Sequence, residues 1–173
     1  MSGGQNSAMM RFCQFLGMVM LATIGVRATP LCASETPGEI RPAKVEITGR
    51  GFEILEMRAK TVAFSMRPYV WTDVPAGIEG LLYTQMAGGG TATVHLKAKE
   101  AGRVFVAVAA SQMLDLKEKG WMLPMPDRSN TFTYNDVHQT MMVILSRQVG
   151  EGEELDVLQL GWTGTIVLLP SDP

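Results

Sequence analysis

The sequence predicts an all-β protein, an antiparallel β-sandwich of the jelly-roll or immunoglobulin-like kind with at most one short helix. Three observations lead to this prediction. After residue 43, short apolar or alternating runs recur about every ten residues, with Gly, Pro, Asp and Asn between them. Some of these runs alternate apolar with polar residues, as strands with one buried face do. One segment alone, residues 111–119, has the pattern of a helix.

The front of the chain has the pattern of a secretory signal peptide. An apolar run of 15 residues, Phe12–Val26, follows an arginine and ends at another. It is short for a bilayer-spanning helix of about 20 residues, and small residues such as Ala28 and Ala33 suit signal peptidase. We therefore expect residues 1–34 to be cleaved, no membrane span, and an extracytoplasmic protein, periplasmic or secreted.

Both cysteines of the chain, Cys13 and Cys32, lie in or beside this leader. Lipoprotein sites have a small residue directly before the cysteine and an apolar one three before it, whereas Leu31 and Thr29 occupy these places. We therefore do not expect lipid anchoring at Cys32. The mature protein has no disulfide, so a packed core must stabilise it.

The mature chain has the size of one domain. Residues 35–43 are polar, contain two prolines and predict a linker, and residues 44–171 predict a single β-sandwich domain. Beyond the leader there are 13 basic and 17 acidic side chains, a net charge of about −4. This charge argues against nucleic acid or an anionic membrane as the partner. The oligomeric state stays open.

The first half of the domain contains several short strand candidates. They are residues 45–48, 52–55, 61–66 and 69–72. Residues 78–86 and 91–99 are joined through Ala87–Gly90, whose glycines allow the positive φ of a tight turn. We therefore expect these two segments to pair as a β-hairpin.

The second half provides the clearest core strands. Thr91–Lys99 alternates and predicts one buried face, whereas Arg103–Ala110 is apolar at nearly every position and predicts a central strand covered on both sides. Thr140–Ser146 and Thr163–Leu169 have the same character. In the helical segment, Ser111 is the expected N-cap and Gly120 the expected stop, and the apolar positions are Met113, Leu114 and Leu116.

Residues that could carry chemistry are few. The mature chain has no cysteine nucleophile and no Gly-x-Ser-x-Gly motif, and neither histidine has the neighbours of a metal ligand, so we predict no catalytic residues, metal or cofactor. His95 falls on the polar side of its strand beside Lys97, which predicts a solvated sheet face. His138 follows Asp136, and a turn role for Asp136 is favoured over a catalytic dyad.

Carboxylates leave two further possibilities open. Glycoside hydrolysis needs two facing carboxylates, and Asp73, Glu79 and Asp115 are conceivable besides Asp136, but no spacing singles out a pair. The acidic segment 150–156 could collect calcium, although a solvated turn between two strands explains it more simply.

Aromatic residues beside predicted turns are better candidates for a ligand site. Exposed rings stack on the faces of sugars or clamp peptides. The candidate ligand-binding residues are Trp121, Trp71, Tyr83 and Trp162. A place in the core is the more common role of such side chains, and it stays open here.

Several segments also carry a family likeness. They occur in order between Ala59 and Pro170, and they read RPYVWTDVP from Arg67, YTQMAGGG from Tyr83, GW at Gly120, FTY at Phe132 and GWTGTIVLLP from Gly161. In this series the chain resembles β-rich domains attached to secreted sialidase-like and other glycan-processing enzymes of bacteria. The resemblance implies a non-catalytic sandwich in a carbohydrate setting and brings no assigned functional residues.

We therefore expect an exported, non-catalytic β-sandwich binding module, with a glycan as the first candidate ligand or a role accessory to glycan processing. The alternative is a structural or protein-interaction domain of the cell envelope. A small secreted hydrolase is the third possibility.

Overall fold

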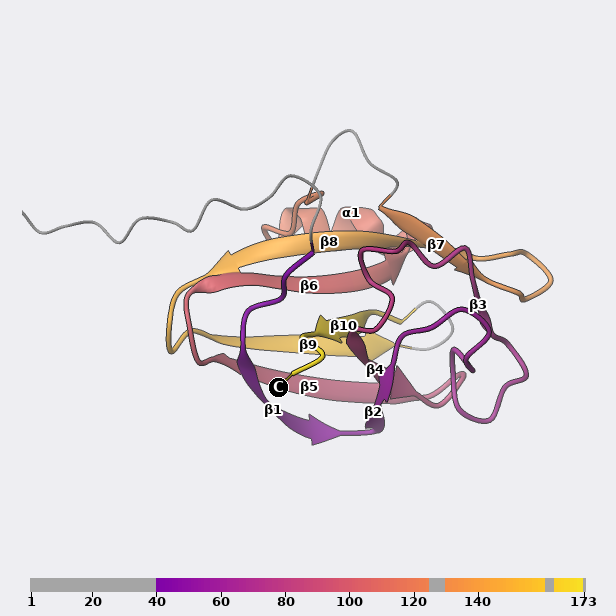
Figure 1. The fold of residues 1–173 in the computed structure, drawn as a ribbon, viewed down its shortest axis with the longest axis horizontal. Coiled ribbons are helices and arrows are strands. Elements are labelled where there is room, and N and C mark those ends of the chain that lie inside the picture. Colours follow the sequence, from indigo (N-terminus) through magenta and orange to yellow (C-terminus); the bar gives the residue numbers. More distant parts are fainter. Residues whose placement is uncertain (1–39, 125–129, 161–163, 173) are drawn as a thin grey trace, which may run out of the picture. The chain divides into compact units, whose positions relative to one another are not determined.

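The computed structural model describes residues 40–124, 130–160 and 164–172 (Figure 1). Its elements are β1 (Val45–Arg50), β2 (Phe52–Glu56), β3 (Trp71–Thr72), β4 (Leu82–Met86), β5 (Thr91–Ala98), β6 (Gly102–Ala109), the 3₁₀ turn η1 (Ala110–Gln112), α1 (Met113–Glu118), β7 (Thr131–Tyr134), β8 (Met141–Val149), β9 (Glu154–Leu160) and β10 (Ile166–Leu169). The expected signal peptide and Cys32 lie outside the described residues. Within these ranges, no helix has the length and apolar character needed to cross a bilayer.

The strands form two antiparallel sheets, one of three strands in the order β1-β5-β9 and one of seven in the order β2-β4-β10-β6-β8-β7-β3. In Figure 1, β6 and β8 run across the upper half of the view and β5 and β9 across the lower half. Apolar side chains from both sheets share one core, among them Val94 and Val157 of the smaller sheet and Val106, Leu145 and Val167 of the larger. This face-to-face packing confirms the prediction of an all-β sandwich.

The central strands of the larger sheet are buried on both faces. Successive residues of β6 alternate between two cores, with Val106 facing the smaller sheet and Phe105 and Ala107 facing a second core. β8 and β10 alternate in the same way, so β10 is buried at every position and β8 is buried from Met142 to Ser146. The three runs predicted as doubly covered core strands are thereby confirmed.

The second core is closed by the segment between β2 and β4, which contributes Met57, Phe64, Trp71 and Ile78. The prediction of strands at 61–66 and 69–72 is largely wrong here, because only Trp71–Thr72 forms a strand and residues 62 and 65 make isolated bridges. Positive φ values of 70° at Lys60 and 64° at Met66 interrupt the extended backbone.

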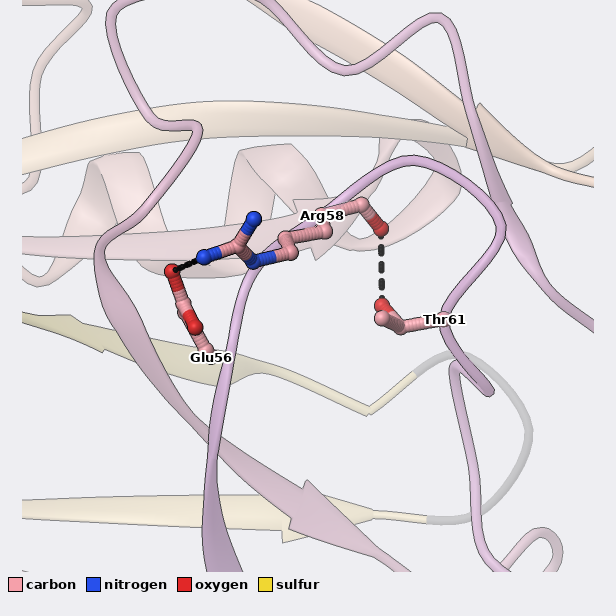
Figure 2. A network of polar contacts seen from close by, with 3 residues as sticks. All are labelled: Glu56, Arg58 and Thr61. Atoms are coloured by element: carbon pink, nitrogen blue, oxygen red, sulfur yellow. Dashed lines mark hydrogen bonds and ion pairs between the residues drawn. The ribbon is translucent and has the colours of Figure 1, made fainter.

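Polar contacts hold the start of this segment against the end of β2. Figure 2 shows Arg58 donating from its guanidinium to Glu56 Oε1 at 2.6 Å, and Thr61 Oγ1 donating to the Arg58 carbonyl at 2.7 Å. The amide of Thr61 donates to the same carbonyl, so the hydroxyl and amide together close a turn. This turn redirects the chain from the sheet edge across the second core.

The expected hairpin between residues 78–86 and 91–99 is wrong. β4 pairs with β2 and β10 in the larger sheet, whereas β5 pairs with β1 and β9 in the smaller one. The glycines at 88–90 make a corner between the sheets instead of a hairpin turn. The burial patterns explain the difference: β4 is covered on both faces, whereas β5 keeps one face in water.

The helix and the domain start also differ in detail from expectation. No side chain caps η1 or α1, so Ser111 does not act as the N-cap, while Gly120 ends the helical segment with φ of 84° as expected. Leu114 is 67% exposed rather than packed inward. Within the expected linker, Ile40 and Ala43 are buried, and the Ala43 amide donates to the Arg103 carbonyl at 2.8 Å.

Candidate functional site

The outer side of the three-stranded sheet carries charged and hydroxyl side chains, which we call the polar face: Glu46, Thr48, His95, Lys97, Glu154 and Asp156. They result from strict alternation, because the residues between them point into the core between the sheets. Together with Leu96 they line an open cavity of about 370 Å³. The solvated position expected for His95 is confirmed.

Strand register orders these side chains into two rows across the sheet. Lys97 of β5 lies opposite Glu46 of β1 on one side and Glu154 of β9 on the other. His95 lies in the same way between Thr48 and Asp156. Cross-strand neighbours on one face are about 5 Å apart at Cβ, so each row forms one continuous surface.

Two contacts pair the central strand with β9. Lys97 Nζ lies 3.3 Å from Glu154 Oε1, and His95 Nδ1 lies 2.5 Å from Asp156 Oδ1. All four side chains are at least half exposed. An exposed ion pair such as Lys97–Glu154 stabilises a fold by about 0–1 kcal/mol, so a ligand can replace exposed contacts of this kind with its own hydrogen bonds at small cost.

One row of the polar face contains residue types that also occur in catalytic triads. The row of Thr48, His95 and Asp156 has the residue types of a nucleophile, a base and an orienting acid. Acyl transfer also needs hydrogen-bond donors for the oxyanion, and the amides of β5 are already used in ladders to β1 and β9. The face thus carries a set of hydrogen-bond donors and acceptors.

Two of the predicted ligand-binding aromatics, Trp71 and Tyr83, are fully buried in the second core. The Trp71 ring packs against four others, with centroids 5.7 Å away at Phe64 and Tyr83, 5.2 Å at Phe132 and 5.9 Å at Tyr134. The Tyr83 hydroxyl donates to the Val62 carbonyl at 2.8 Å, and burial raises the pKa of this phenol. In this conformation neither ring presents a face to a ligand.

The other two candidates are Trp121 and Trp162. Trp121 is 5% exposed and belongs to the core between the sheets, whereas Trp162 falls outside the described residues. The structure therefore does not bring the predicted aromatics together at a surface site, and sugar stacking on Trp162 stays a prediction.

The segment that contains Asp136 and His138 is a turn before β8. Asp136 accepts hydrogen bonds from the Thr140 amide and hydroxyl, each at 2.7 Å, so the interpretation of Asp136 as a turn residue is confirmed. Burial opposes ionisation of Asp136, but these hydrogen bonds outweigh it and hold the carboxyl pKa below its ordinary value. Asp73, another possible acid, accepts a hydrogen bond from Thr133 Oγ1.

Replacing Asp136 with asparagine is expected to destabilise the fold by about 1 kcal/mol at neutral pH, since a charged acceptor is lost at a cap-like position. Because the carboxyl pKa is lower in the folded protein than in the unfolded chain, the ionised carboxylate stabilises the fold at pH values above the pKa of the unfolded chain. This contribution disappears as the pH falls through the pKa of the folded protein. The difference between variant and wild type should therefore shrink below about pH 4. Urea unfolding at pH 7 and pH 3 measures it, and a constant difference would contradict the assignment.

Sequence reasoning placed His95 and Lys97 on a wet face but missed the acidic residues of β1 and β9 as their neighbours. The signal was partly visible, because residues 154–157 alternate polar and apolar side chains as β5 does, but Leu158, Gln159 and Leu160 then invert the pattern, with the leucines exposed and the glutamine buried. Which strand lies beside which depends on long-range pairing that alternation alone does not specify.

Comparison with known proteins supports the fold alone. No family model matches this chain, and no curated protein sequence matches it either. Among solved structures, the chain is similar to part of a GH138 enzyme targeting pectin rhamnogalacturonan II, with a TM-score of 0.54 and 14% identity. The match covers 76% of this chain and 16% of that enzyme, so this chain corresponds to a small part of a much longer protein.

Proposed function

We propose that this chain is an exported, non-catalytic β-sandwich module that binds a glycan on its polar face. The observation that carries the proposal is the row of paired, exposed side chains across β1, β5 and β9, over a cavity of about 370 Å³. Export rests on the leader-like pattern of residues 1–34.

Glycans suit this surface because every sugar presents several hydroxyls that both donate and accept. Glu154 and Asp156 accept from hydroxyls, while Lys97 donates to ring and hydroxyl oxygens. Because such hydrogen bonds involve charged groups, each is stronger than one between neutral partners. The face therefore offers several charge-assisted contacts within the span of one or two sugar rings.

The likeness to part of a GH138 enzyme is compatible with a module that accompanies glycan processing. It carries no argument for a particular sugar, since the likeness is one of fold.

A protein partner is the second candidate function, and a separate surface favours it. The edge strand β2 exposes Ile54 and Leu55, 42% and 38% accessible, beside two carboxylates. Edge strands of this kind add strands from other chains. Binding that is independent of sugar and abolished by Ile54→Lys would favour this function.

The test is a glycan array followed by titration calorimetry on the best ligand. Asp156→Asn and Lys97→Ala are each expected to weaken binding at least tenfold, or about 1.4 kcal/mol, with unchanged thermal unfolding because exposed substitutions alter stability little. Glu53→Gln, an exposed carboxylate on β2 in the other sheet, is the matched control. Absence of binding to every glycan, or an equal loss in the control, would refute the polar face as the site.

A further inference from the structure

We infer that the glycan is an extended neutral chain, which runs along β9 from the polar face into a second subsite beside α1. This inference rests on the proposed function and deepens it. We call the second subsite the α1–β9 groove, a cavity of about 110 Å³ lined by both apolar and polar residues.

The groove has the composition expected of a subsite for a sugar ring. Leu116, Leu158 and Leu160 contribute apolar surface, and Gln112, Asp115 and Lys119 contribute polar groups. Sugars present C–H faces and hydroxyl edges, so a site that combines both kinds of contact suits them. Leu158 and Leu160 are 56% and 53% exposed, which leaves their side chains available to a ligand.

Strand β9 joins the groove to the polar face. Its outward residues are Glu154 and Asp156 at one end, on the polar face, and Leu158 and Leu160 at the other, in the groove. With a rise of about 3.3 Å per residue, the four positions span about 20 Å in a line. That length exceeds one sugar ring and fits a chain laid along the strand.

The groove wall on the helix side is positioned by the core. Leu116 packs partly into the core between the sheets, and the amide of buried Trp121 donates to the Leu116 carbonyl at 3.2 Å. Trp121 thus acts beneath the surface as a positioning residue for the groove.

The charges of both subsites favour a neutral chain. Besides His95, the polar face has three carboxylates and one lysine, and the groove has Asp115 in α1 and Lys119 directly after it. The excess of carboxylates repels a polyuronate, whose sugar rings carry carboxylates themselves. Uncharged hydroxyls can form hydrogen bonds with both anionic and cationic side chains.

The experiment measures binding affinity as a function of oligosaccharide length. The neutral series runs from disaccharide to hexasaccharide and is built from the sugar found on the array. Oligogalacturonides form the acidic series. In the wild type, affinity is expected to rise at least tenfold along the neutral series. Leu160→Ser should abolish this rise and leave disaccharide binding unchanged. Lys119→Gln is a second groove variant, and Leu114→Ser on the exposed side of the same helix is the matched control.

The outcomes separate the two proposals. Glycan binding that is independent of length, or an equal effect of Leu114→Ser, overturns the second subsite and leaves the proposed function standing. If oligogalacturonides bind more tightly than the neutral oligosaccharides, the inference that the glycan is neutral is wrong. If no glycan binds, both proposals fail.

Discussion

Replacing Trp71 with alanine is expected to lower the free energy of unfolding by about 3–5 kcal/mol, the usual cost of removing a large buried aromatic side chain. Trp71 is inaccessible to solvent and contacts the rings of four other aromatic residues. It also links β3 to the rest of the second core, because its backbone pairs with both Thr61 and Tyr134. A cavity at this point would loosen the segment that covers the larger sheet.

Urea unfolding followed by circular dichroism measures this loss as a lower midpoint. Trp71→Phe is the control, since it keeps an aromatic ring in the cluster and should cost less. If Trp71→Ala unfolded at the wild-type midpoint but lost glycan binding, the ring would be a ligand contact and its placement in the core would be refuted.

Replacing Gly49 with alanine is expected to lower the free energy of unfolding by about 3–5 kcal/mol. The backbone strain of a positive φ and the steric overlap of the new Cβ both contribute to this loss. Gly49 has φ of 133°, and a Cβ there would lie 2.0 Å from the carbonyl oxygen of Thr93. That oxygen belongs to the backbone of β5, so the overlap can be removed only if β1 moves away from β5. Gly49 precedes the corner at which the chain leaves the smaller sheet for the larger.

Gly152→Ala is the matched control for this change. Gly152 also has a positive φ, 77°, but a Cβ there meets nothing within 4 Å. Its substitution should cost only the backbone strain of about 1–2 kcal/mol. The same urea experiment distinguishes the two, and equal losses would contradict the close approach of β1 to β5.

The elements best predicted from the sequence were those whose burial follows from the residues themselves. The continuous apolar run of β6 and the alternation of β5 report how many faces of each strand are covered, and both predictions hold. β7 could have been found in the same way, because Thr131–Tyr134 alternates and its two aromatics are buried.

The connections between strands could not be read in this way. A glycine-rich link such as residues 87–90 is compatible with a hairpin or with a corner between sheets, since glycine permits both. The choice is made by which partners bury β4 and β5, and these partners are far away in the sequence.

The candidate site depended on the same information. Residue type suggested aromatic rings beside turns, yet Trp71, Tyr83 and Trp121 are buried, because covering both faces of the larger sheet requires large apolar side chains. From the sequence, the polar face was visible only as one wet strand; pairing placed acidic residues on both sides of Lys97 and on one side of His95.

By itself the sequence determined the all-β class, the core strands and the wet face of β5. Alternating and continuous apolar runs indicate which residues of a strand are buried, and they are visible within each segment alone. It also predicts export, through the leader. Only the tertiary structure decided the two-sheet topology, the burial of the candidate aromatics and the meeting of β1, β5 and β9 at one polar surface. These features depend on contacts between residues distant in the chain, whose pairing is set by the joint burial of many side chains rather than by any local pattern.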